Sequence, residues 1–249
     1  MKGKILTIIC LFGFIAANAQ VDSLAVSNVV KSGAEITLPA MTKKRINLSY
    51  AHHSFCISLP IATVGLALIP ADKHISHSVQ TALPGFNSVF DDYLQYVPWA
   101  AHAAMGLCGV KGVSKNRFQI ITADALAAVM MATMVNGLKY SINRTRPDGG
   151  SASFPSGHTA TAFAGATLLV HEYGHRSIWI PVAGYTLATT AGVMRVLNNR
   201  HYVSDVVVGA AVGILTAELA YWATDAIFND LKYTKSHRQR VRNEILNNY

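Results

Sequence analysis

A loop rich in Gly and Ser turns into an apolar helix at Phe154-Pro155-Ser156-Gly157-His158, and the rest of the sequence is arranged around this stretch. Pro155 suits a helix start because its φ is fixed and it has no N–H. Ser156 is a good N-cap, and Gly157 lets the backbone come close to a ligand. The free N–H groups and the dipole of a helix start attract anions. The stretch therefore predicts an anion site with His158 at its mouth.

Charged side chains on either side of this stretch suit a phosphate. Lys139 and Arg146 precede it, and Arg195, His201 and Asp205 follow it. Two guanidinium groups and one ammonium match a tetrahedral oxyanion. His201 and Asp205 are four residues apart, so they share one face if a helix begins there. Asp205 can then accept a hydrogen bond from one ring nitrogen of His201 and leave the other nucleophilic.

The remaining histidine, His158, can protonate the leaving oxygen as a general acid. Together these residue types predict phosphoryl transfer through a phosphohistidine on His201. This chemistry needs neither a metal nor another cofactor, and we expect none.

The three motifs resemble the signature of the type-2 phosphatidic acid phosphatase superfamily, which also holds bacterial class A acid phosphatases and vanadium haloperoxidases. The motifs are Lys139-x6-Arg146-Pro147, Pro155-Ser156-Gly157-His158 and Arg195-x5-His201-x3-Asp205. One departure is Met194, which stands where the family usually has Ser before the third-motif Arg. This removes one hydroxyl donor near the phosphate but no catalytic group.

The resemblance implies a role for each matching residue. His201 is the implied nucleophile, Asp205 its orienting partner and His158 the general acid. The implied phosphate binders are Lys139, Arg146, Ser156, Gly157 and Arg195.

Composition favours a membrane protein of one main domain. The chain has 249 residues, a net charge of +8 and a mean hydropathy of +0.28. Only 14% of its residues are charged, against about a quarter in typical soluble domains. No run of basic residues interleaved with aromatics suggests nucleic acid as a partner. We expect a phosphorylated lipid or a small phosphate ester as substrate, and no obligate protein partner is evident.

The ends of the chain have their own compositions. Residues 1–19 carry Lys2 and Lys4, then an apolar run and Ala17-Asn18-Ala19, which predicts a secretory signal peptide. An uncleaved anchor is the alternative. We expect an N-terminal arm at 20–50, a phosphatase-like helical domain at 51–230 and a basic tail at 231–249. Because Cys56 and Cys108 lie in apolar stretches, we expect buried thiols.

Apolar segments define the expected fold. They span 54–69, 97–110, 118–138, 158–170, 178–194 and 205–223, with a polar connector at 71–96. Four of them begin or end at a motif, so the motifs meet at one end of the bundle. The prediction is an all-α antiparallel bundle of about five to six main helices, membrane-embedded, with the active site at one end. Asp124, Glu218 and His102 must then face its interior.

Charge in the loops predicts the orientation. If the motifs face outward, the basic segments 111–117, 171–176 and the tail face inward, as the positive-inside rule requires. This favours a bacterial inner membrane with a periplasm-facing site. A cleaved leader would place residue 20 outside, and a full span at 54–69 would then reverse the orientation. Whether 54–69 crosses the membrane stays open at this point.

Three other functions fit parts of the sequence. They are a soluble periplasmic acid phosphatase, a vanadate-dependent haloperoxidase and a non-enzymatic lipid-binding bundle. A His-Glu-x-x-His zinc pattern at His171–His175 is set aside because it contains Gly174 and lies at an expected helix end. Phosphatidate, isoprenyl pyrophosphates and lipid A phosphates remain equally open as substrates.

Overall fold

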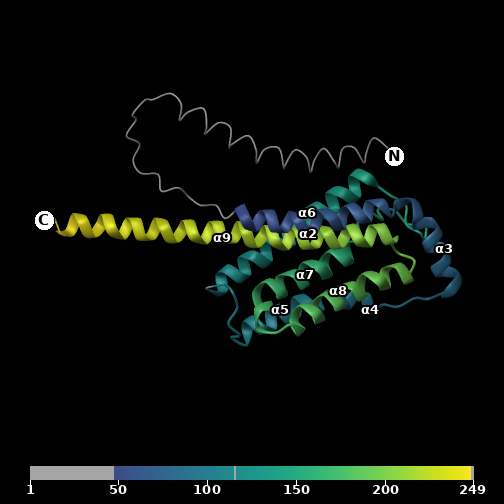
Figure 1. Cartoon of the computed structure of the whole chain (residues 1–249), viewed down its shortest axis with the longest axis horizontal. Coiled ribbons are helices and arrows are strands. Elements are labelled where there is room, and N and C mark those ends of the chain that lie inside the picture. The colour runs from purple at the N-terminus through teal and green to yellow at the C-terminus, as the bar shows by residue number, and fades with distance from the viewer. Residues whose placement is uncertain (1–47, 115, 248–249) are drawn as a thin grey trace, which may run out of the picture. The chain divides into compact units, whose positions relative to one another are not determined.

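All regular elements in the described part of the chain are helices (Figure 1). The computed structural model describes residues 48–114 and 116–247. The elements are α2 (Leu48–Ala67), η2 (Ile69–Ala71), α3 (Asp72–Ala82), α4 (Phe90–Leu94), α5 (Val97–Leu107), α6 (Arg117–Ile142), α7 (Gly157–Tyr173), η3 (Gly174–Arg176), α8 (Trp179–Leu197) and α9 (Val203–Asn247). The predicted all-α class is confirmed.

Contacts between distant segments show that the main helices run antiparallel. At one end, Arg144 follows α6 and bonds both Asp72 at the start of α3 and Asp205 in the first turn of α9. At the other end, Ser114 precedes α6 and donates to Glu172 near the end of α7. We call these the motif end and the opposite end. Helices α2, α6 and α8 run toward the motif end, and α5, α7 and α9 run away from it.

Helix α7 is the centre of the bundle and packs against α5, α6, α8 and α9. Small residues let α9 approach it closely. A Cβ at Gly209 would lie 2.6 Å from the Ser156 carbonyl oxygen, and one at Gly213 would lie 2.4 Å from the Ala160 carbonyl oxygen. Close approach of this kind is typical of helix pairs in membranes. It fixes the first turn of α7 against α9, where the site lies.

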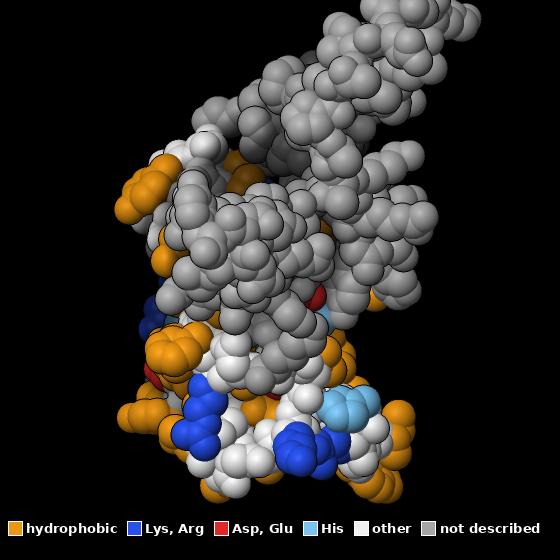
Figure 2. All heavy atoms as spheres, turned by 90° about the vertical axis from the view of Figure 1, so that its left-hand side faces the viewer, with side chains coloured by type: hydrophobic (Ala, Val, Ile, Leu, Met, Phe, Trp, Pro, Cys, Tyr) orange, Lys and Arg blue, Asp and Glu red, His pale blue; other side chains and the backbone are white. Residues whose placement is uncertain are grey.

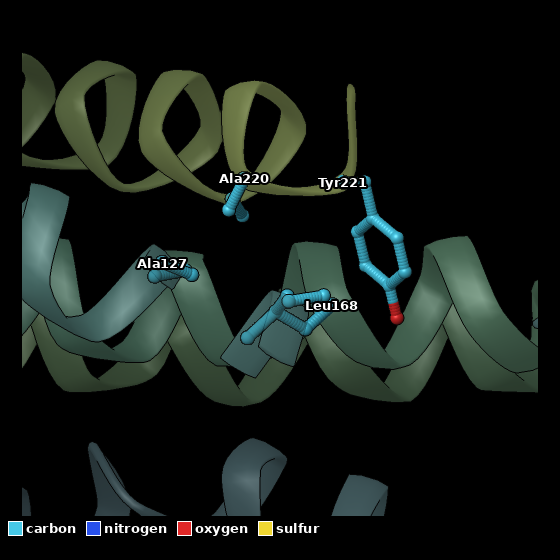
Figure 3. Close-up of a cluster of buried hydrophobic side chains, with 7 residues drawn as sticks. Ala127, Leu168, Ala220 and Tyr221 are labelled. Carbon is cyan, nitrogen blue, oxygen red and sulfur yellow. The ribbon is translucent and has the colours of Figure 1, made fainter. Parts of the chain in front are cut away.

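A cluster of buried side chains joins three helices, as Figure 3 shows. Ala127 of α6, Leu168 of α7 and Ala220 of α9 meet there, and the ring of Tyr221 points from α9 toward α7. The Tyr221 hydroxyl donates to the Glu172 carboxylate at 3.2 Å. The small alanines let the helices pack tightly. The Tyr221 hydroxyl adds a polar contact between α9 and α7 toward the opposite end.

The polar residues expected to face the interior have partners there. His102 is 1% exposed and its Nδ1 lies 3.4 Å from the Asp124 carboxylate. The Glu218 carboxylate lies 3.8 Å from His171 Nδ1. Pairing of this kind is expected for ionisable groups at membrane depth, because an isolated charge there is costly.

Four segments are long and apolar enough to cross a membrane, namely Phe55–Ala82, Arg117–Ile142, Trp179–Leu197 and Val203–Phe228. Large apolar side chains on them face outward, including Val64, Ile121 and Trp179. Such a surface is unfavourable in water and matches lipid, which supports the expected membrane-embedded bundle. The expectation of buried thiols was wrong, because Cys56 and Cys108 are both exposed. At these two positions the helix surface faces away from the core.

The helices depart from the sequence expectation at several places. The connector 71–96 contains α3 and α4, and α9 continues to Asn247 rather than ending at 223. Helix α6 runs to Ile142 and ends where Asn143 adopts a left-handed φ of 42°, which Asn tolerates. Gly174 ends α7 as predicted. The leader and the arm up to residue 47 lie outside the described residues and stay predictions.

The structure shows which way segment 54–69 runs through the bundle. It lies in α2, which packs along α9 and ends at the motif end beside Asp72. Residue 48 is therefore at the opposite end, and α2 runs the length of the bundle like its neighbours. If the motif end faces the periplasm, residue 48 lies on the cytoplasmic side.

Candidate active site

The three motifs meet at the motif end because each lies where a helix ends or begins. Lys139 is in the last turn of α6, and Arg195 is in the last turn of α8. His158 is in the first turn of α7, and Asp205 is in the first turn of α9. This placement follows from the order of the helices along the chain.

The N-terminus of α7 is held by its own cap and by α9. The Ser156 side chain accepts a hydrogen bond from the Thr159 N–H, and the Ser156 N–H donates to the Asp205 carbonyl oxygen at 2.9 Å. Ser156 is fully buried. The first N–H groups of the helix, at Gly157 and His158, have no partner within it and form an anion-binding start.

Lys139 lies at this helix start, and two more cations are near it. The Lys139 ammonium donates to the Ala152 carbonyl oxygen at 2.6 Å, and its side chain approaches Gly157. The positive charges of Arg146 and Arg195 are both near enough to act electrostatically on the Lys139 ammonium. Arg195 is 7% exposed, and its buried Nε has no hydrogen-bond partner among the described residues. A buried donor without a partner is unusual and suits a group that receives a ligand.

His201 lies beside Asp205, as the i, i+4 spacing predicted. His201 is 2% exposed and Asp205 is fully buried. The distance from His201 Nδ1 to Asp205 Oδ2 is 3.7 Å, and the Nδ1 atom makes no hydrogen bond. Contacts of this kind are often long in a free enzyme and shorten when substrate binds. Nδ1 faces the carboxylate, which leaves Nε2 as the nitrogen available for attack.

The environment keeps the His201 ring neutral. Burial lowers the pKa of His201 from 6.5 to about 4, and the Lys139 and Arg195 charges act in the same direction. The Asp205 carboxylate opposes this shift without cancelling it. An imidazole with this pKa is unprotonated at neutral pH, so its lone pair is free.

We expect acidification to destabilise the protein through His201. The unfolded chain takes up a proton near pH 6.5, whereas the folded ring stays neutral until about pH 4. Stability from this group is therefore present above pH 6.5 and is lost as the pH falls toward 4. Between pH 7 and 5 wild type should lose about 2 kcal/mol more unfolding free energy than His201→Gln. Unfolding in one detergent at both pH values measures this; equal losses would contradict it.

Sequence reasoning missed a buried network behind Asp205. Arg144 Nη1 donates to Asp205 Oδ1 at 2.8 Å, and Nη2 donates to Asp72 Oδ2 at 2.7 Å. The Arg144 guanidinium also lies over the Tyr202 ring, 4.3 Å from its centre. The second carboxylate oxygen of Asp205 accepts from Ser153 Oγ at 2.5 Å. These contacts fix the plane of the carboxylate that faces His201.

Two further carboxylates on α4 were also missed, since they fell within the expected polar connector. Asp91 is fully buried and accepts from Arg195 Nη1 at 2.5 Å. Asp92 accepts from the same nitrogen at 3.4 Å, and its Oδ1 lies 2.8 Å from His158 Nε2. The side chain of Asp92 is 53% exposed. Helix α4 thus places negative charge beside both a predicted phosphate binder and the predicted general acid.

The ligand atoms of Asp91, Asp92 and His158 lie within 4.8 Å of one another, a spacing that a metal ion could use. The Arg195 guanidinium already donates to both carboxylates. Because a cation at this position would face that positive charge, we assign the three residues to an ion-paired network with Arg195.

Known proteins resemble this chain in sequence. The sequence profile of the PAP2 superfamily matches residues 148–228, which include the second and third motifs. Over 230 residues the chain is 40% identical to the lipid A 1-phosphatase of Porphyromonas gingivalis. This match covers 91% of the chain and 51% of the relative, so the chain spans about half of that protein's length.

Two solved structures match part of the chain. The crystal structure of Aquifex aeolicus LpxE matches with a TM-score of 0.44 and 21% identity, over 58% of this chain and 92% of that one. A transmembrane PAP2-type phosphatidylglycerolphosphate phosphatase from Bacillus subtilis matches with a TM-score of 0.43 and 20% identity. That match covers 69% of this chain and 94% of the other.

Proposed function

We propose that this chain is a membrane phosphatase of the PAP2 superfamily, whose model matches residues 148–228, and that it hydrolyses lipid phosphates through a phosphohistidine on His201. The observation that carries the proposal is the buried, neutral His201 among Asp205, Lys139 and Arg195 at the motif end. The apolar outer surface supports a lipid as the substrate. A relative named lipid A 1-phosphatase makes lipid A phosphates the first candidates, ahead of phosphatidate and isoprenyl pyrophosphates.

The chemistry proceeds in two balanced steps. His201 Nε2 attacks phosphorus with its lone pair, and the bond from phosphorus to the leaving oxygen breaks. The electron pair goes to that oxygen, which takes a proton from the His158 imidazolium and departs as an alcohol. Water then attacks the phosphohistidine and returns a proton to His158. The nitrogen–phosphorus electron pair returns to His201, and inorganic phosphate is released.

The cations and the helix start stabilise the phosphoryl group during both steps. Lys139, Arg146 and Arg195 compensate the charge on its oxygens, and the Gly157 and His158 N–H groups are placed to donate to them. Donors fixed before the reaction contribute most, because they need no reorganisation as charge develops. Ser156 acts here as the cap that sets the helix start, since its side chain is buried against Thr159.

Phosphate release by the purified chain in detergent tests the proposal. The substrates compared are lipid A carrying a 1-phosphate, phosphatidate, an isoprenyl pyrophosphate and the soluble ester p-nitrophenyl phosphate. We expect kcat/KM to be higher for a lipid phosphate than for the soluble ester. Equal values for all substrates would favour the acid phosphatase alternative, and no release from any substrate would refute a phosphatase.

We also propose that the motif end faces the periplasm of a bacterial inner membrane. Figure 2 shows exposed Lys and Arg side chains on the side of the molecule where the opposite end lies. Lys111, Arg117 and Arg176 are exposed in the segments at that end, and they favour a cytoplasmic side there. Membrane-impermeant thiol labelling of intact cells checks this in a background without Cys10, Cys56 and Cys108. A cysteine replacing Gly150 should label and one replacing Val113 should not; the reverse pattern would overturn the orientation.

A further inference from the structure

The contact between α4 and the start of α7 is not explained by phosphate binding. His158 Nε2 and Asp92 Oδ1 lie 2.8 Å apart, within hydrogen-bond distance. The motif residues alone do not require an acid at this place, and Asp92 lies 66 positions before His158 in the sequence. An ion pair with an exposed carboxylate normally adds little stability, so stability alone does not account for this contact.

We propose that Asp92 is a positioning residue that orients the His158 ring and favours its protonated form for its role as general acid. This proposal rests on the proposed phosphatase function and adds to it a residue outside the three motifs. The structure supports it through the hydrogen bond to Nε2, which leaves Nδ1 as the ring nitrogen that can reach the leaving oxygen. Among the described residues, His158 Nδ1 has no hydrogen-bond partner.

The charges around His158 show why such a carboxylate is needed. Arg195 of α8 faces the ring, and burial together with this positive charge lowers the pKa of His158. A lower pKa leaves a smaller fraction of the His158 rings protonated at neutral pH, so fewer of them can act as an acid. The Asp92 and Asp91 carboxylates of α4 act in the opposite direction and favour the imidazolium, so they limit the lowering of the pKa without cancelling it. Asp91 is engaged by Arg195 and Asn198, so Asp92 is the carboxylate that bonds the ring directly.

The proton then follows one path. Nε2–H remains hydrogen-bonded to Asp92 throughout, and the Nδ1 proton passes to the leaving oxygen. The neutral ring later takes a proton at Nδ1 from the attacking water, which regenerates the imidazolium. This arrangement resembles the way Asp205 serves His201, but the charge state is the opposite, since one ring must be neutral and the other protonated.

The test is the pH dependence of kcat for Asp92→Asn on an alkyl phosphate in detergent. General acid catalysis is lost as the pH rises through the pKa of the acid. Without the carboxylate, this alkaline limb should move to lower pH by about one unit, and kcat at pH 8 should fall by about tenfold. Asp92→Glu should restore part of the shift. Asp148→Asn is the matched control, because Asp148 also pairs with an arginine at the motif end yet bonds no histidine.

A second substrate separates the chemical role from a structural one. p-Nitrophenyl phosphate has a good leaving group that needs little protonation, so Asp92→Asn should hydrolyse it at a rate close to wild type. Equal losses on both substrates, an unmoved alkaline limb, or a change confined to KM would each overturn the proposal. Wild type failing to release phosphate from these esters and from the lipid phosphates named above would instead refute the phosphatase function itself.

Discussion

His201→Ala should lower kcat for the best lipid phosphate by about 10⁴-fold or more, because removal of a nucleophile eliminates the covalent route. The ring is buried and neutral, and its Nδ1 makes no hydrogen bond, so its removal leaves no charge unpaired. We therefore expect the variant to fold. Steady-state kinetics and thermal unfolding in the same detergent measure the two effects separately.

The matched control for His201 lies at the opposite end. His102 is also buried, at 1% exposed, and its Nδ1 also lies near a carboxylate, 3.4 Å from Asp124. His102→Ala should cost a similar amount of stability and leave kcat within about twofold of wild type, because it lies far from the motifs. A His201→Ala enzyme as active as His102→Ala would contradict the proposed mechanism.

The second large effect is on stability. Arg144→Ala should lower the free energy of unfolding by about 3–5 kcal/mol, because it leaves the Asp72 and Asp205 carboxylates buried without their counter-charge. For a chain of this size, that corresponds to a fall in unfolding temperature of at least about 6 °C. Arg144→Lys keeps the charge but loses the two-pronged geometry, so its loss should be smaller.

Arg200→Ala provides the comparison for Arg144. Arg200 pairs with Asp148 at 3.1 Å, but its side chain is 52% exposed. An exposed pair contributes about 0–1 kcal/mol, so this variant should unfold close to the wild-type temperature. Equal losses of stability in both variants would contradict the claim that the buried Arg144 network holds Asp205 in place.

The motif residues could be located from the sequence because each lies at a helix end. The run of apolar residues before Lys139 and the run after His158 fix the direction of α6 and α7, and the same logic applies to Arg195 and Asp205. Four such ends of antiparallel helices must meet. The burial of His201 and the length of its contact with Asp205 could not be predicted, since both depend on packing.

The supporting residues were missed because their partners are remote. Asp72 meets Ser204 across 132 positions, and Asp91 meets Arg195 across 104. A lone Asp in a polar connector resembles a surface residue, and a single sequence gives no sign of a distant arginine. One signal was present: Asp72 directly follows a long apolar segment, so it lies at the same end as the motifs.

The error at the two thiols has a physical cause as well. Cys56 and Cys108 lie in apolar stretches, but an apolar residue in a membrane bundle can face either the core or the lipid. Hydrophobicity does not distinguish these two faces, since lipid tails are as apolar as a protein interior. Of the four candidate spans, those that contain α2, α6 and α8 are mostly exposed, whereas Val203–Phe228 of α9 is mostly buried within the bundle.

Trapping the intermediate tests the central claim most directly. The enzyme is quenched in base during turnover of a radiolabelled lipid phosphate, and the labelled peptide is identified by mass spectrometry. We predict phosphate bound through an acid-labile, base-stable nitrogen–phosphorus bond on the peptide containing His201, and no such label in His201→Ala. Label on a different residue, or rapid turnover by wild type without any phosphorylated enzyme, would contradict the account.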